Sequence, residues 1–131
     1  MNIAIDTSVL VDAERGQVDL IAMLAQSTDA FYLPVMARAE WLVGLKLVKG
    51  ATLIRAQQFK MHVLDQLPVF AMESNHADLL AALIAEARRK GRTIKPYDAA
   101  IAAQVLAEAG KTILCSDDDY TGVSGINIIR P

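Results

Sequence analysis

Short runs of β-branched and aliphatic residues alternate with longer stretches of helical character, and this alternation limits the possible folds most. The short runs predict strands, at Asn2–Ile5, Ala30–Leu33, Val69–Ala71, Thr112–Cys115 and Ile126–Ile129. The longer stretches predict helices, at Thr7–Glu14, Val18–Ala25, Val35–Val48, Thr52–Leu67, Asn75–Lys90 and Pro96–Ala109. Because strands separated by helices need crossover connections, the pattern favours a mainly parallel sheet. We therefore predict an α/β fold, a three-layer α/β/α sandwich with about five strands.

The last strand and the chain length predict two further features, an edge pairing and a single domain. Only a short loop precedes Ile126–Ile129, so we expect this strand to pair antiparallel at an edge of the sheet. With 131 residues, the chain has the size of one ordinary domain. We therefore expect a single domain over residues 1–131.

Composition excludes several classes of protein. Hydrophobic residues make up 53% of the chain, which excludes a disordered protein, and the net charge of −2 gives no general attraction for nucleic acid. No apolar run free of charge reaches the roughly 18 residues of a membrane span, so no membrane contact is expected. The single cysteine excludes an internal disulfide framework. Asp6 stands where a signal peptide would need its basic and apolar regions, so we expect a cytoplasmic protein.

Carboxylates follow the predicted strands. Asp6 ends the first strand, a run of acids from Asp117 to Asp119 ends the fourth, and Glu40 lies early in the helix after the second. Sites in open parallel sheets form beyond the carboxyl ends of the strands, so these acids are expected to meet. Asp98 opens the helix that feeds the fourth strand, and we expect a plain crossover helix to begin at the opposite edge. Asp98 then joins the other acids only if the helix Asn75–Lys90 returns the chain to the carboxyl edge.

Such a cluster of acids favours a divalent cation. Carboxylates held close together raise one another's pKa, and the arrangement is costly unless a cation neutralises it. Hard oxygen ligands select Mg²⁺ or Mn²⁺, and such a site suits hydrolysis of a phosphodiester. Each acid also has a purely structural explanation: a helix cap for Asp6, a solvated helix acid for Glu40, a favourable helix start for Asp98, and a polar loop for Asp117–Asp119.

Two further features accompany the acids. The only basic run of the chain, Arg88–Lys95, directly precedes Asp98 and could bind phosphates beside a metal site or form a solvated helix end. Cys115 is expected to be a small core residue.

Four motifs and a closing strand, in order across nearly the whole chain, resemble the PIN-domain ribonucleases, and among them the VapC-type toxins of toxin–antitoxin pairs. The motifs are Ile3–Val11 (IAIDTSVLV), Ala39–Gly44 (AEWLVG), Ile94–Ala103 (IKPYDAAIAA) and Cys115–Tyr120 (CSDDDY), and Gly125–Ile129 (GINII) matches the final strand. Two departures stand out. Pro34 and Ala37 occupy positions where many members carry Ser or Thr, and Cys115 replaces the usual Thr.

The resemblance implies a metal-dependent endoribonuclease, the toxin of a type II toxin–antitoxin pair. Its catalytic acids would be Asp6, Glu40, Asp98 and Asp117. The same four would hold Mg²⁺ or Mn²⁺, with Asp119 as a further or supporting ligand, and the run of three aspartates leaves a one-residue choice between Asp117 and Asp118. The resemblance also implies a homodimer, a VapB-type antitoxin whose tail blocks the acidic pocket, and RNA such as transfer RNA as substrate.

Two other functions stay open. One is a catalytically weak PIN-fold module that binds RNA or protein, against which the full set of acids argues. The other is an unrelated Mg²⁺-dependent phosphotransfer domain. A receiver domain needs paired acids after its first strand, and a haloacid-dehalogenase phosphatase needs a second aspartate at position 8, whereas here Asp6 is followed by Thr7 and Ser8.

Overall fold

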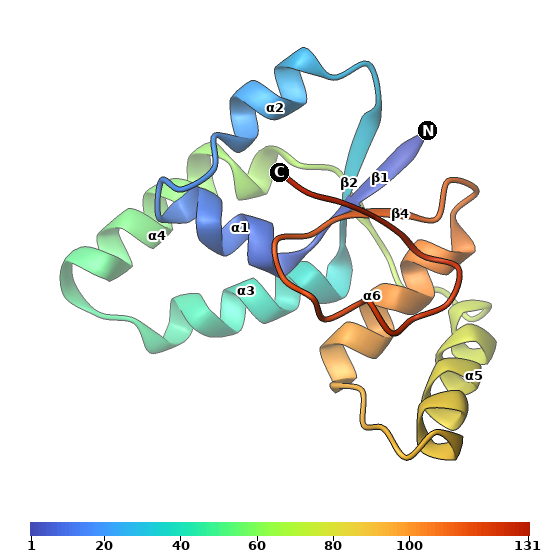
Figure 1. Ribbon diagram of the computed structural model, residues 1–131. Coiled ribbons are helices and arrows are strands. Elements are labelled where there is room, and N and C mark those ends of the chain that lie inside the picture. The colour runs from blue at the N-terminus through green and yellow to red at the C-terminus, as the bar shows by residue number, and fades with distance from the viewer.

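A computed structural model describes residues 1–131, and it contains one five-stranded sheet (Figure 1). The strands are β1 (Asn2–Ile5), β2 (Ala30–Pro34), β3 (Val69–Phe70), β4 (Thr112–Leu114) and β5 (Asn127–Ile129). They lie in the order β3-β2-β1-β4-β5, and every neighbouring pair is parallel. The expected α/β fold with a parallel sheet of five strands is therefore confirmed.

Six helices and one 3₁₀ turn connect the strands. They are α1 (Thr7–Glu14), α2 (Leu20–Gln26), α3 (Val35–Leu47), α4 (Gly50–His62), η1 (Leu64–Gln66), α5 (His76–Arg89) and α6 (Pro96–Ala107). Helices α1 to α4 gather on one side of the strands and α5 and α6 on the other, which gives the predicted three layers (Figure 1). No helix has the length and apolar character that a membrane span requires.

The expected antiparallel pairing of the last strand is wrong. Strand β5 runs parallel to β4, with Thr112 beside Asn127 and Leu114 beside Ile129. The connection over residues 115–126 contains no helix, but its twelve residues are enough for a parallel crossover, which needs about a dozen. The loop therefore crosses the carboxyl edge of the sheet and returns to the start of β5, and it carries the three consecutive aspartates across that edge.

Helix α6 is the most buried helix of the molecule. Every residue from Asp98 to Val105 is buried, because the helix contacts β2 as well as α3 and α5. Four of these eight residues are alanines, whose small side chains let the helix pack closely on several sides at once. Gln104, in the same segment, donates to the carbonyl oxygens of Phe70 (2.8 Å) and Ala71 (3.2 Å) and so joins α6 to the end of β3.

The expectation that a crossover helix into β4 would begin at the opposite edge is wrong. A helix that connects two parallel strands runs antiparallel to them, so it starts where strands end. Helix α5 brings the chain back toward that edge, and α6 starts there (Figure 1). The N-terminal turn of α6, with Asp98, therefore lies at the carboxyl edge of the sheet.

Candidate active site

The register of the two central strands brings the first and last acidic segments together. Ile5 of β1 is paired with Leu114 of β4, and the backbone N–H of Asp6 donates to the carbonyl oxygen of Leu114 at 3.0 Å. Asp6 and Cys115 consequently leave the sheet side by side, although they are 109 residues apart in the chain. A shift of one residue in this pairing would turn the side chains of one strand to the opposite face of the sheet and separate Asp6 from Cys115.

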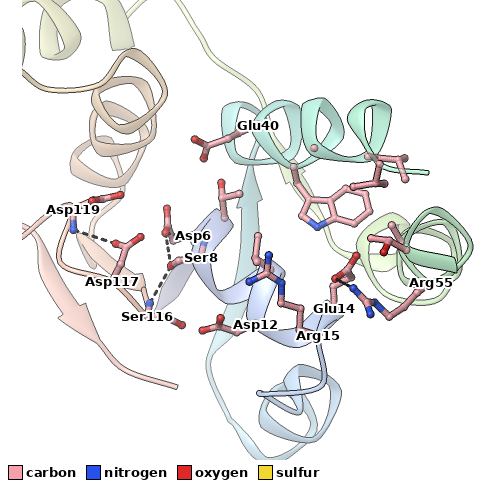
Figure 2. A pocket seen from close by; sticks show the side chains of 18 of the residues that line it. Asp6, Ser8, Asp12, Glu14, Arg15, Glu40, Arg55, Ser116, Asp117 and Asp119 are labelled. Atoms are coloured by element: carbon pink, nitrogen blue, oxygen red, sulfur yellow. Dashed lines mark hydrogen bonds and ion pairs between the residues drawn. The ribbon is translucent and has the colours of Figure 1, made fainter. Parts of the chain in front are cut away.

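All five acids predicted for the site line one pocket of about 590 Å³. They come from four segments: the start of α1, the second turn of α3, the first turn of α6, and the loop after β4. They are Asp6, Glu40, Asp98, Asp117 and Asp119. Figure 2 shows the carboxylates of Asp6, Asp117 and Asp119 close together, with Glu40 above them on α3. Their roles in catalysis or metal binding are taken up below as proposals.

Asp6 is both a helix cap and a pocket residue, so the two explanations of its position do not exclude each other. Its carboxylate Oδ2 accepts from the backbone N–H of Ser8 at 3.0 Å and from Ser8 Oγ at 2.6 Å. Asp6 is therefore the N-cap of α1. The residue is 3% exposed, and these contacts fix its orientation.

Tyr120 holds the other carboxylate oxygen of Asp6. The tyrosine is fully buried, and its hydroxyl donates to Asp6 Oδ1 at 2.8 Å. Burial, and then the negative charge of Asp6, raises the pKa of Tyr120, so the hydroxyl keeps its proton and acts as a donor. The sequence showed only an aromatic residue after the acidic run, and nothing local could reveal a contact across 114 positions.

Ser8 and Cys115 connect Asp6 to the loop after β4. Ser8 Oγ accepts from the backbone N–H of Ser116 at 3.0 Å (Figure 2). Cys115 Sγ lies 3.1 Å from Asp117 Oδ1 and 3.5 Å from Asp6 Oδ2. Burial, and then the charge of Asp6, raises the pKa of the Cys115 thiol, which therefore stays protonated and shares its one proton between the two carboxylates. Cys115 is thus a buried core residue, as expected, and also a hydrogen-bond donor within the site.

The loop after β4 separates the three consecutive aspartates. Asp117 and Asp119 line the pocket, and the backbone N–H of Asp119 donates to Asp117 Oδ1 at 3.1 Å. Asp118 turns outward: its side chain is 86% exposed and pairs with Arg130 at 2.9 Å. This geometry favours Asp117 over Asp118 as the fourth acid.

Arg130 anchors this loop and is absent from the sequence-based predictions. It follows β5, and its guanidinium donates to the carbonyl oxygens of Cys115 (3.0 Å) and Asp117 as well as to the Asp118 carboxylate. A lone arginine near the end of the chain has no local signal that links it to an acidic loop. The parallel position of β5 beside β4 creates the contact.

No basic side chain forms an ion pair with any of the five acids. Burial raises the pKa of Asp98 to about 6, with further contributions from the negative charges of Asp119, Glu40 and Asp6. Burial and the charge of Asp117 likewise raise the pKa of Asp119. Buried charges in proteins are normally paired or bound to a metal, so this arrangement fits a divalent cation. Ligand atoms of Asp6, Cys115 and Asp117 lie within 4.8 Å of one another, a group that could hold a metal ion.

Asp98→Asn is expected to stabilise the metal-free protein at about pH 7. Because the native pKa of about 6 exceeds the ordinary value of 3.8, the native state binds more protons than the unfolded chain between those values. Stability is therefore lost as the pH rises from about 4 to 6, and an uncharged residue avoids that loss. Solvent screening in the open pocket leaves roughly 1 kcal/mol, or about 3–5 °C in Tm.

The measurement is thermal unfolding in chelator at about pH 4 and pH 7. Asp78→Asn is the matched control, because Asp78 lies in the first turn of α5 as Asp98 does in α6, but it is exposed. This control should gain nothing at either pH. Added Mn²⁺ should stabilise the wild type more than the Asp98 variant. An equal gain for Asp98→Asn at both pH values would contradict the electrostatic explanation.

The pocket continues from the acids to a more apolar end. Trp41 lines it and packs against Phe59, with ring centroids 5.6 Å apart. At the far end, Arg55 pairs with Glu14 at 3.4 Å (Figure 2). Thr7 Oγ1 donates to the carbonyl oxygen of Ala37 at 3.4 Å. The Thr7 hydroxyl therefore lies beside Ala37, a position where many PIN-domain ribonucleases carry Ser or Thr.

A family model described as PIN domain matches residues 3–126. Several solved structures share the fold. VapBC2 from Rickettsia felis, bound to a promoter DNA fragment, has a TM-score of 0.84 and 18% identity, with 100% of this chain and 99% of that chain covered. VapBC-5 from Mycobacterium tuberculosis has a TM-score of 0.77 and 24% identity over 99% and 98% of the chains. FitAcB from Neisseria gonorrhoeae has a TM-score of 0.78 and 20% identity over 98% and 96%. Among curated protein sequences, none matches this chain.

Proposed function

This chain belongs to the PIN domain family, and from that membership we propose that it is a metal-dependent endoribonuclease, the toxin of a type II toxin–antitoxin pair. The proposal assigns the activity to a single PIN-like nuclease domain over residues 1–131. The observation that carries it is the convergence of five carboxylates from four segments on one pocket, with no basic side chain paired to them.

The proposed cofactor is Mg²⁺ or Mn²⁺. PIN domains bind divalent metal ions, and the carboxylate oxygens here are the hard ligands that these two ions prefer. Asp6 and Asp98, both buried, would be the main metal ligands, and Glu40 and Asp117 would complete the site. When bound, the cation would neutralise the cluster and stabilise negative charge on the phosphate. The Cys115 thiol is a poor ligand for these ions because it keeps its proton.

Side chains of the pocket orient the proposed metal ligands and can accept the proton of the attacking water. Ser8 and Tyr120 hold the two oxygens of Asp6, so that carboxylate is in place before a substrate arrives. One carboxylate of the pocket would help to orient the attacking water or accept its proton. Hydrolysis adds the water oxygen to phosphorus and breaks the bond from phosphorus to O3′. The products then carry a 5′-phosphate and a 3′-hydroxyl.

The proposed partners are a VapB-type antitoxin and a second copy of this chain. The solved structures with this fold include VapBC and FitAB complexes, in each of which one chain matches along almost its whole length, and this supports a toxin of the same kind. The antitoxin tail would block the acidic pocket. A neighbouring small open reading frame that encodes a DNA-binding protein, and co-purification of its product with this chain as a multimer, would test the partnership.

Cleavage of RNA by the purified protein tests the enzymatic proposal. We expect cleavage of transfer RNA or a structured RNA in Mn²⁺ or Mg²⁺, none in chelator, and recovery when the metal is restored. The ends of the products provide the control for contamination. Ribonucleases that use the 2′-hydroxyl as nucleophile leave cyclic phosphates and need no metal, whereas the proposed reaction leaves 5′-phosphates. Metal-independent cleavage, or no cleavage of any RNA, would refute the assignment.

A further inference from the structure

A second pocket, of about 220 Å³, adjoins the acidic one, and three cationic residues line it beside Glu86, Asp98 and Asp119. Its walls come from the end of α5, the loop from Lys90 to Lys95, and the loop over residues 119–124. Asp98 and Asp119 line both pockets, so the two hollows meet across these carboxylates. We define the basic pocket by its three cationic residues, Lys90, Arg92 and Lys95.

Two of the three cations have no anionic partner within the protein. Lys90 pairs with Glu86 at 3.0 Å, while Arg92 and Lys95 take part in no ion pair. The Arg92 guanidinium lies over the loop at Gly122, where an added Cβ would come 2.9 Å from Nη1. Both side chains belong to exposed residues, so each can take an external anion without breaking an ion pair.

Lys95 stands at the boundary between the two pockets. Burial raises the pKa values of Asp98 and Asp119, and the ammonium group of Lys95 opposes the rise at both residues. Lys95 is also the N-cap of α6, so the partially positive end of this helix adds to the same potential. The hydroxyls of Thr93 and Ser124 line the pocket as well and supply neutral hydrogen-bond donors.

The carboxylates of the acidic pocket repel the phosphates of an RNA strand, and the cations beside them reduce this repulsion. An RNA strand carries a phosphate at every nucleotide, and a divalent cation compensates only the phosphate bound to it. The next phosphate along the strand faces carboxylates in a protein of net charge −2. Unpaired cations immediately beside the acids remove that repulsion and fix the direction in which the strand leaves the site.

We propose that the basic pocket holds a phosphate of the RNA strand adjacent to the one that is cut, with Arg92 and Lys95 as its ligands. The proposal rests on the proposed function, and it makes these two residues determinants of RNA binding and not of bond cleavage. It predicts a non-sequence-specific, salt-dependent contact, because phosphates carry no base information.

The test is the salt dependence of binding to a fluorescein-labelled single-stranded oligoribonucleotide, measured by anisotropy in Ca²⁺, with gel electrophoresis to check that the RNA stays intact. Each phosphate contact in a single strand contributes about 0.7 to the slope of log affinity against log salt. Arg92→Gln and Lys95→Gln should each bind more weakly, and because both residues hold the same phosphate, the double variant should lower the slope by about 0.7.

Arg89→Gln is the matched control. Arg89 belongs to the same basic run and is exposed, but it does not line the pocket, so its loss should leave the slope unchanged. Equal slopes for all variants, or no binding of RNA by the wild type, would overturn the inference. Cleavage is not measured in this titration, so a failed subsite and a failed nuclease assignment give different results: the first appears only in the slopes, the second only in the cleavage assay.

Discussion

Asp6→Asn should abolish RNA cleavage and leave the protein folded. The substitution keeps the size of the side chain and removes the negative charge that we assign to the metal. Asparagine is as good an N-cap as aspartate, so the hydrogen bond to Ser8 that begins α1 can survive. The amide group can also donate to the Tyr120 hydroxyl, which then accepts instead of donating. Since residues that only orient a ligand are typically worth about 10- to 100-fold, loss of a ligand should cost more than about 100-fold in cleavage rate.

The measurement is the initial rate of cleavage in Mn²⁺, together with thermal unfolding to verify the fold. Asp19→Asn is the matched control, because Asp19 caps α2 by accepting from the backbone N–H of Ala22 at 3.0 Å and lies outside the pocket. It should cleave at the wild-type rate. Wild-type cleavage by a clean preparation of Asp6→Asn would remove Asp6 from the site and, with it, the assigned ligand set.

The three consecutive aspartates should differ sharply in a substitution series. Asp117→Ala is expected to lower the cleavage rate by roughly 100-fold, because it removes a carboxylate from the pocket and loosens the loop. Asp118→Ala should be nearly silent, since that side chain is exposed and its ion pair with Arg130 contributes little to stability. Asp119→Ala should fall between them, because Asp119 lines the pocket at its exposed side.

A fourth variant separates charge from loop structure. Asp117→Asn keeps an oxygen that can accept from the backbone N–H of Asp119, so the turn can form, but it cannot supply a carboxylate. Cleavage of a fluorogenic RNA in saturating Mn²⁺ compares all four proteins. If Asp117→Asn is as active as the wild type, Asp117 only shapes the loop. An inactive Asp118→Ala beside an active Asp117→Ala would mean that the fourth acid is Asp118.

Local patterns determined most of the fold. The strands and most of the helices follow from apolar runs and their spacing, because burial of one face imposes a period that the sequence displays directly. The helix predicted at Thr52–Leu67 is the main exception. It ends at His62, and a 3₁₀ turn follows, which places the fully buried Leu64 in the core. The acids of the pocket were visible for a related reason: each stands beside a strand end or in the early turns of a helix, and parallel strands end at one edge.

Contacts between distant segments were decided by the tertiary structure alone. Three such contacts are the position of Asp117 in the pocket, the donation from Tyr120 to Asp6, and the anchoring of the loop by Arg130. The last of them depends on β5 lying parallel to β4. Neither hydrophobic period nor turn chemistry specifies that choice, because a twelve-residue loop can connect either arrangement. The basic run is visible in the sequence, but only the packing of α5 and α6 places its free cations beside the acids. Strand register and chain crossings therefore decide which charges meet, because they depend on the packing of the whole core and not on any local segment.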